Sequence, residues 1–204
     1  MSATATTSPR LTGPQRREQI LDVTRAIVGE KGFHAISIDG VAKRAGITRP
    51  VVYTHFEDLP GLLRALIERE SVRALTQLAE LLPRPGDGQD PGDMLAGSLR
   101  AFLEAVHAEP ITWRLVLMPP DGTPAVLREQ VVTARAAVTA QLAQIAPQAL
   151  AAGGRETSPD AELTALSLQA IAEESARLLL DDPDTYPIDR LVDHARWLLG
   201  LLDL

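Results

Sequence analysis

The stretch SIDGVAKRAGITRPVVYTHF, Ser37–Phe56, predicts two short helices that are joined by a tight turn. Ser37 can cap the first helix with its hydroxyl, and apolar residues then recur at helical spacing. Gly46 is expected to end this helix, since glycine adopts the left-handed conformation at little cost. Thr48 can cap the second helix, and Pro50 falls in its first turn, where a missing N–H removes no intrahelical bond.

The second helix, Arg49–His55, is expected to turn one side inward and to leave the other side free. Val52 and Phe56 lie one turn apart and form the inner side. The remaining side chains of the helix point elsewhere: Arg49, Pro50, Val51, Tyr53, Thr54 and His55. Because a helix-turn-helix of this kind places its second helix in the major groove, the stretch predicts DNA binding.

The composition favours an all-α protein. The chain has 204 residues, of which 45% are hydrophobic and only 3% aromatic, and no segment is typical of a strand. It contains no cysteine, which excludes disulfides, thiolate metal sites and cysteine nucleophiles. No segment has the apolar length of a signal peptide or of a membrane span. We therefore expect a cytoplasmic protein that does not bind membranes.

The charge of the chain is divided unevenly along its length. The formal net charge is −7, which by itself argues against a protein that binds nucleic acids. Residues 1–60, however, hold eight Lys and Arg residues against six Asp and Glu residues, while the rest of the chain holds 12 basic and 21 acidic residues. This division favours a head that contacts DNA and an acidic body that phosphates repel.

Prolines, glycines and helical periodicity divide the chain into three parts. Residues 1–13 are rich in Ser, Thr and Ala and predict a flexible N-terminal arm. Residues 14–60 predict a three-helix domain that contains the helix-turn-helix and binds DNA. Residues 61–204 predict a second, helical domain, in which a connecting helix at 61–82 leads to a Pro- and Gly-rich loop at 83–92.

The C-terminal part is expected to form a helical bundle. Caps and turn signals place its later helices at 94–108, 110–118, 123–145, 158–180 and 188–202, with a loop at 148–158. The predicted fold is therefore all-α, with about nine helices: an N-terminal three-helix head that binds DNA, followed by a C-terminal helical bundle domain.

Several short motifs follow one another in the N-terminal quarter of the chain: Gly32-Phe33, Val41-Ala42, Gly46-Ile47 and Tyr53-Thr54-His55-Phe56. With the amphipathic helix before them, they resemble the head of the tetracycline-repressor (TetR) family of bacterial transcription regulators over roughly residues 15–65. In that family a divergent helical domain follows the head, dimerises and usually binds a small inducer. The resemblance therefore implies a homodimer, a double-stranded DNA operator and an unknown small-molecule effector. It also implies that residues 61–204 form the domain for ligand binding and dimerisation.

The recognition helix offers side chains for both bases and phosphates. Arg49 is its one long cation, and arginine is the commonest reader of guanine. Pro50 and Val51 can contact a thymine methyl group. The resemblance implies that Tyr53 and His55 donate hydrogen bonds to phosphate oxygens, which positions the helix without reading sequence. On position alone, these rings also suit a structural role at the edge of a small core.

Further DNA contacts are expected at helix ends and on the first helix of the motif. Ser37 and Thr48 stand at helix N-termini, where exposed N–H groups favour a phosphate. Lys43 and Arg44 can add ionic contacts to the backbone of the duplex. Thr54 completes the set of residues that are expected to face DNA.

The chain departs from the family directly after the recognition helix. Many TetR proteins have a lysine at the entry to the fourth helix, where this chain has Glu57, Asp58 and Leu59. Leu59 cannot contact a phosphate, and the two acids oppose one. We therefore expect DNA affinity to depend less steeply on salt than in relatives with the lysine.

Candidates for a ligand site lie on the helices at 94–108 and 110–118. Large or polarisable side chains there are Met94, Phe102, His107, Trp113 and Met118. The alternative is that these residues form ordinary bundle core. His107 and His194 have no partner at metal-ligand spacing, so neither a metal nor a cofactor is expected.

The last two helices carry more apolar surface than a peripheral pair should expose. The residues expected at a two-fold interface are Leu163, Leu166, Ala170, Leu178, Leu191, Ala195, Leu198 and Leu202. Pairing across a two-fold axis would form a four-helix interface and set two recognition helices about 34–36 Å apart, as a palindromic operator requires. The alternative is that these stripes pack only within the subunit.

These features predict a sequence-specific DNA-binding transcriptional regulator. We expect a repressor that leaves a palindromic operator when a small-molecule inducer binds the C-terminal domain. The alternative is a DNA-binding regulator that has no small-molecule inducer and is controlled by its abundance or by a protein partner. Since the sequence contains no nucleophile elbow, phosphate loop or paired catalytic carboxylates, no enzymatic activity is expected.

Overall fold

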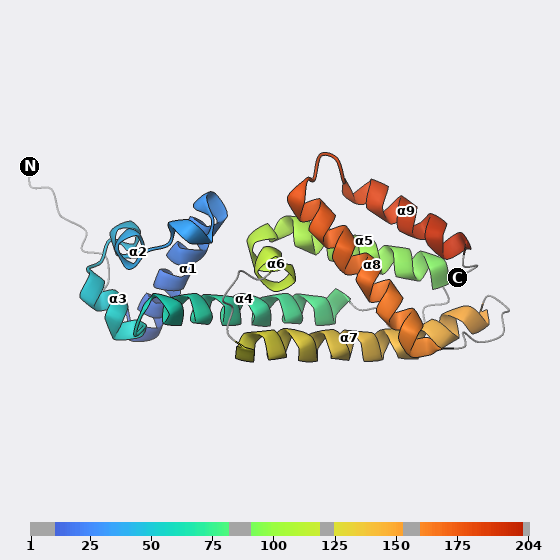
Figure 1. The fold of residues 1–204 in the computed structure, drawn as a ribbon, viewed down its shortest axis with the longest axis horizontal. Helices are drawn as coiled ribbons and strands as arrows, with labels where there is room; N and C mark the ends of the chain where they lie inside the picture. Colours follow the sequence, from blue (N-terminus) through green and yellow to red (C-terminus); the bar gives the residue numbers. More distant parts are fainter. Residues whose placement is uncertain (1–10, 82–90, 119–124, 153–159, 202–204) are drawn as a thin grey trace, which may run out of the picture. The chain divides into compact units, whose positions relative to one another are not determined.

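The computed structural model describes residues 11–81, 91–118, 125–152 and 160–201. In these residues the backbone forms nine α-helices, one turn of 3-10 helix at Phe33–Ala35 and no strand, which confirms the predicted all-α fold. No helix among them is long and apolar enough to cross a bilayer. The helices are α1 (Gly13–Lys31), α2 (Ile38–Ala45), α3 (Arg49–His55), α4 (Leu59–Leu81), α5 (Pro91–Ala108), α6 (Pro110–Leu117), α7 (Ala125–Ala152), α8 (Ala161–Asp181) and α9 (Ile188–Leu201) (Figure 1).

The chain divides into two compact units, Met1–Leu66 and Ile67–Leu204. The first unit contains α1 to α3 and the first turns of α4, and the second contains the rest of α4 and α5 to α9. The sequence placed the boundary after residue 60, before the connecting helix, whereas the structure places it within that helix. Most of the predicted arm, residues 1–10, lies outside the described residues.

Helix α1 begins with a capping box. Gln15 N donates to Thr12 Oγ1 at 3.4 Å, and Thr12 N donates to Gln15 Oε1 at 3.0 Å. One side of the helix is buried in the first unit, at Ile20, Leu21 and Ile27. This burial is what an amphipathic helix needs, because most of its stability comes from packing rather than from propensity.

The helix-turn-helix has the bounds that the sequence predicts. Gly40 N donates to Ser37 Oγ at 3.1 Å, so Ser37 is the N-cap of α2. Gly46 is left-handed, with φ 66° and ψ 32°, and ends this helix. Thr48 occupies the N-cap position of α3, but its hydroxyl makes no capping hydrogen bond, so this part of the prediction is wrong.

Helix α4 begins at Leu59, slightly before the predicted start at Gly61. Gly61 N donates to Asp58 Oδ1 at 2.7 Å, which makes Asp58 the cap of the first turn. A carboxylate is favourable at this end of a helix, because it lies at the positive end of the helix dipole. Asp58, one of the two acids expected to oppose a phosphate, therefore has a structural role.

The second unit is built around one apolar core. Buried side chains of α4, α5, α6, α8 and α9 form it: Ala74, Ala96, Phe102, Leu103, Val106, Trp113, Ala176, Leu179, Leu180, Leu191 and Val192. The rings of Phe102 and Trp113 meet edge to face, with centroids 5.1 Å apart and an interplanar angle of 87°. This pair holds α5 against α6.

Helix ends in the second unit differ from the prediction in three places. Helix α5 begins at Pro91 rather than Met94, since proline fits the first turn of a helix. Helix α7 continues past Ile145 to Ala152, because the Gln, Ala and Leu residues assigned to a loop are strong helix formers. Leu163 N donates to Asp160 Oδ1 at 3.0 Å, so Asp160 caps α8, while Ser158 lies outside the described residues.

Candidate functional site

The recognition helix α3 separates its inner and outer sides as predicted. Val52 is fully buried and Phe56 is 5% exposed, whereas Tyr53 is 51% exposed. The other residues expected to face DNA are exposed or half-buried: Ser37, Lys43, Arg44, Thr48, Arg49, Pro50, Val51, Thr54 and His55. None of the candidate contact residues is buried in the core, so their side chains can contact a duplex.

Arg49, which is expected to contact guanine, forms an ion pair with Asp39 of α2. Its Nε and Nη2 atoms donate to the two carboxylate oxygens of Asp39. Both side chains remain mostly exposed, at 61% and 59%. A bidentate pair of this geometry fixes the plane of the guanidinium and leaves the Nη1 group for another acceptor.

Arg44 is engaged in the same way by Glu30. Both Nη atoms of Arg44 donate to the Glu30 carboxylate at 2.5 Å. These hydrogen bonds hold the pKa of Glu30 below its ordinary value. Glu30 therefore stays ionised at neutral pH, and the pair joins α1 to α2 on the surface of the head.

Other polar groups of the first unit shape this surface from within. Thr54 Oγ1 donates to Pro50 O at 2.9 Å, which directs the hydroxyl back onto its own helix. The guanidinium of Arg17 lies over the Phe56 ring, 5.1 Å from its centroid. Sequence reasoning missed this support from α1, because no local pattern connects residues so far apart in the chain.

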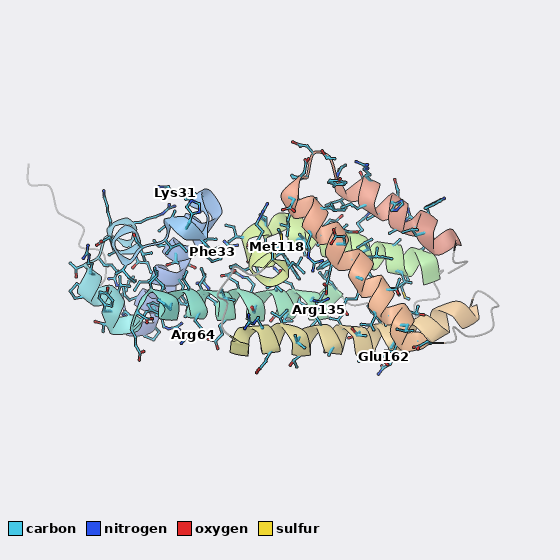
Figure 2. All side chains as sticks on the ribbon, in the orientation of Figure 1. Lys31, Phe33, Arg64, Met118, Arg135 and Glu162 are labelled. Atoms are coloured by element: carbon cyan, nitrogen blue, oxygen red, sulfur yellow. The ribbon has the colours of Figure 1, made fainter. Side chains whose placement is uncertain are left out.

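The second unit contains a cavity of about 260 Å³. Residues of α4 to α9 line it, and most of their side chains are hydrocarbon. Phe102 and Trp113 are the predicted ligand residues that reach it. Met94, His107 and Met118 do not line it; His107 is exposed, and Met118 lies at the end of α6, 37% exposed (Figure 2). The volume is near the lower end of the range for ligand sites.

An ionic cluster centred on the buried carboxylate of Glu173 lies on one wall of the cavity. The Glu173 carboxylate of α8 accepts from Arg135 at 2.8 Å and from Arg177 at 3.2 Å (Figure 2 labels Arg135 on α7). Gln169 Nε2 also donates to Glu173, at 2.8 Å. The cations of this wall are therefore already paired with a carboxylate.

Helices α4 and α6 are joined by a second buried carboxylate beside the cavity. Glu70 is fully buried, and Thr112 Oγ1 donates to its Oε2 atom at 2.5 Å. Arg69 Nη2 donates to its Oε1 atom at 2.9 Å. The residues that follow Glu70 and Thr112 in the sequence, Ser71 and Trp113, both line the cavity.

The predicted dimer residues fall into different environments. Leu163 and Leu166 are 60% and 45% exposed, and Ala170 on the same helix is exposed. Leu191 and Ala195 are buried within the subunit, and Leu178 and Leu198 are half-buried; Leu202 lies outside the described residues. Sequence reasoning missed Trp197, which is 57% exposed on α9 and stacks on His194 with ring centroids 5.5 Å apart.

Within the described residues, no group of three or more His, Cys, Asp or Glu side chains is placed to hold a metal ion. His107 and His194 are both exposed there.

Comparison with known proteins agrees with this geometry. Residues 20–66 match the family model described as bacterial regulatory proteins, tetR family. The chain is 27% identical over 181 residues to the HTH-type transcriptional activator FasR of Mycolicibacterium smegmatis, a match that covers 89% of this chain and 78% of FasR.

Solved structures extend the similarity to the whole fold. A TetR-like transcriptional regulator from Rhodococcus sp. RHA1 superposes with a TM-score of 0.69 at 25% identity, covering 95% of this chain and 99% of that one. The regulator FadR from Bacillus subtilis, solved in complex with stearoyl-CoA, gives a TM-score of 0.64 at 16% identity, covering 89% and 96%. With its helix-turn-helix head and its helical C-terminal unit, the chain belongs to the TetR family of DNA-binding transcriptional regulators.

Proposed function

We propose that the protein is a homodimeric repressor that leaves a palindromic operator when a small apolar molecule occupies the cavity of the second unit. The observation that carries this proposal is that α4 contributes residues to both units. Leu62 and Leu66 of this helix are buried in the first unit, and Ser71 to Leu81 of the same helix supply walls of the cavity. A ligand that contacts these walls acts on the helix that also carries the head.

The mechanism follows from linkage. A ligand that binds one arrangement of α4 better than another shifts the population toward the arrangement that it favours. If DNA favours the other arrangement, the ligand lowers operator affinity by the same factor by which DNA lowers ligand affinity. Couplings of this kind typically amount to about 5–150-fold.

The fold comparison supports an apolar effector. FadR of Bacillus subtilis, which shares this fold, was solved with stearoyl-CoA, a molecule with a long hydrocarbon chain. The cavity described above is likewise lined mainly by hydrocarbon. FasR, in contrast, is named as an activator. Our proposal of repression is therefore based on the mechanism above, and the promoter measurement below tests it.

Dimerisation is assigned to the exposed side of α8. Leu163, Leu166 and Ala170 recur at the spacing of one helix face, and all are exposed. Exposed leucines at this spacing are typical of a helix that packs against a partner. A two-fold axis at this face would present two recognition helices to successive major grooves.

Filling the cavity tests the inducer mechanism. Ala172 lines the cavity, so Ala172→Phe is expected to abolish release by apolar compounds while operator affinity stays within about twofold of wild type. The operator is selected from random DNA with the full chain, and release is measured with alkanes, fatty acids and their methyl esters. The matched control Ala137→Phe, on the exposed side of α7, should respond like wild type.

A promoter that carries the selected operator reports the direction of regulation. Lower transcription with the protein than without it, restored by a releasing compound, is the expected result. If compounds bind the chain but leave operator affinity unchanged, the inducer mechanism is wrong, and control by abundance or by a protein partner takes its place.

Removing one hydroxyl tests the phosphate contact of the recognition helix. Tyr53→Phe should weaken operator binding about tenfold, since a hydrogen bond to a charged group is worth about 1.5–3 kcal/mol. Thermal stability should not change, because Tyr53 is 51% exposed. Tyr186→Phe removes the other tyrosine hydroxyl of the chain and should leave DNA affinity unaltered. Equal affinities for both variants would assign Tyr53 a purely structural role.

The acid beside Arg49 is expected to limit binding to arbitrary sequences. Asp39→Asn removes a negative charge and its ion pair from the DNA-facing surface. Affinity for random DNA should rise, and the slope of log affinity against log salt should steepen by about 1. The ratio of operator to random affinity should fall. Asp189→Asn, which breaks the 2.7 Å pair with Arg100 in the second unit, controls for net charge. An unchanged slope in Asp39→Asn would contradict this prediction.

Placing a charge on the exposed face of α8 tests the dimer interface. Leu163→Glu should weaken self-association by at least tenfold, because it buries an unpaired carboxylate between two apolar helices. Sedimentation at several concentrations measures this, and operator affinity should fall with it. Val72→Glu changes an aliphatic residue of α4 that is also 60% exposed, and this variant should remain a dimer. Undiminished association of Leu163→Glu would place the interface elsewhere.

A further inference from the structure

One face of α7 carries an arginine among apolar residues. Val131, Arg135, Val138 and Leu142 recur at the spacing of one side of a helix, and all four line the cavity of the second unit. An apolar residue at position 135 would continue the hydrocarbon wall. Arg135 instead adds a permanent positive charge, because a guanidinium does not lose its proton in proteins. The cavity therefore offers a ligand one charged position on an otherwise apolar side of α7.

Arg135 lies at the open edge of the cavity. Its side chain lines the cavity and is 53% exposed (labelled in Figure 2). Phe102 and Trp113, which line other parts of the wall, are only 8% and 2% exposed. A ligand therefore meets buried apolar surface in one part of the cavity and a solvent-exposed cation in another.

The charges on the cavity wall do not balance. Among the described residues that line it, Arg135 and Arg177 are positive and only Glu173 is negative. Both arginines donate to the same oxygen, Glu173 Oε2, Arg135 at 2.8 Å and Arg177 at 3.2 Å. The other oxygen, Oε1, accepts from Gln169 Nε2 at 2.8 Å. One carboxylate is therefore shared by two cations, and the wall retains one positive charge.

Arg135 is the cation that can accept a further partner. Arg177 also donates to Glu174 at 3.2 Å and to Leu117 O at 3.4 Å, so three groups engage it. Glu174 is 63% exposed and does not line the cavity, so its charge is screened by solvent. Within the described residues, the structure gives Arg135 no acceptor besides Glu173. Since a guanidinium has five N–H groups, Arg135 can bind a second carboxylate and keep the first.

The neutral polar groups of the wall offer no alternative contact of this kind. Ser98 Oγ already donates to Met94 O at 2.9 Å. The polar side-chain atoms of Ser71 and Trp113 have no partner among the described residues, but neighbouring atoms cover them, so a ligand cannot reach them. The charged group of a ligand is therefore expected at Arg135.

We propose that the cavity binds an apolar carboxylic acid whose hydrocarbon body lies inside and whose carboxylate pairs with Arg135 at the open edge. This inference rests on the proposed function for the ligand role of the cavity and adds the charge of the ligand. Burying the hydrocarbon body removes apolar area from water. The carboxylate keeps part of its hydration because Arg135 is half exposed, which reduces the penalty for burying a charge.

Calorimetry on the full chain, without DNA, tests the charge of the ligand. The probes are nonanoate, methyl octanoate and decylamine, which have equal numbers of non-hydrogen atoms and are anionic, neutral and cationic at neutral pH. Nonanoate should bind about tenfold more tightly than methyl octanoate, the effect of one hydrogen-bonded charged contact. Decylamine should bind more weakly than either. Equal or tighter binding of the ester or the amine would overturn the assignment.

A variant of Arg135 identifies the contact. Arg135→Met keeps an unbranched side chain of similar length and removes the charge, so it should weaken nonanoate binding about tenfold. Binding of methyl octanoate should stay within about twofold of wild type, since the apolar wall is kept. The matched control is Arg128→Met, because Arg128 is exposed on the same helix and does not line the cavity. Equal losses for both ligands in Arg135→Met would give Arg135 a purely structural role and reject the proposal.

Salt dependence gives an independent measure of the ion pair. Salt screens exposed charges, with a Debye length of about 10 Å at 0.1 M and about 3 Å at 1 M. Affinity for nonanoate should therefore fall as salt is raised, whereas affinity for methyl octanoate should not. In Arg135→Met the two ligands should respond to salt alike. Nonanoate affinity that is independent of salt in the wild type would contradict pairing at the exposed Arg135.

The outcomes separate this inference from the proposed function. Nonanoate binding that depends on Arg135 but leaves operator affinity unchanged would retain the ligand assignment and reject the inducer mechanism. Operator release by nonanoate that is equal in wild type and Arg135→Met would retain the mechanism and reject the assignment.

Discussion

The buried carboxylate of Glu70 is the constraint on which the cavity of the second unit depends. Its side chain is fully buried, so its charge has to be met by the protein. Thr112 donates to it from α6 at 2.5 Å, and Arg69 donates to it at 2.9 Å. Removing one partner of a buried charge typically destabilises a protein by about 3–5 kcal/mol. Helices α4 and α6 are therefore held at one separation, and the next residue of each becomes part of the cavity wall.

In the first unit, by contrast, the ion pairs lie on the surface, where another anion can replace the carboxylate. Arg49 is paired with Asp39 and Arg44 with Glu30, and in both pairs the side chains remain substantially exposed. Exposed pairs of this kind contribute only about 0–1 kcal/mol, so a phosphate or a guanine can replace the acid at little cost. The acids nevertheless reduce the positive field that attracts any duplex. This arrangement favours a head that binds weakly to arbitrary DNA and relies on correctly placed contacts.

The sequence predicted local features well and long-range features poorly. The bounds of α2 and α3 were correct because Ser37 and Gly46 act on their own helix ends. The end of α7 was wrong because Gln, Ala and Leu residues near Ala152 fit either a loop or a helix. Of the predicted cavity residues, Phe102 and Trp113 were placed correctly. Ser71 could not be found, since an isolated serine in a helix carries no signal until the packing around it is known.

The coupling between an effector and an operator sets what the cavity has to do. Such coupling requires about 1–3 kcal/mol. A ligand supplies this free energy only where its contacts differ between two arrangements of α4. Apolar contact contributes affinity, but unless it differs between the arrangements, it shifts nothing. The wall residues that belong to α4, from Ser71 to Leu81, are therefore the part of the cavity on which this coupling depends.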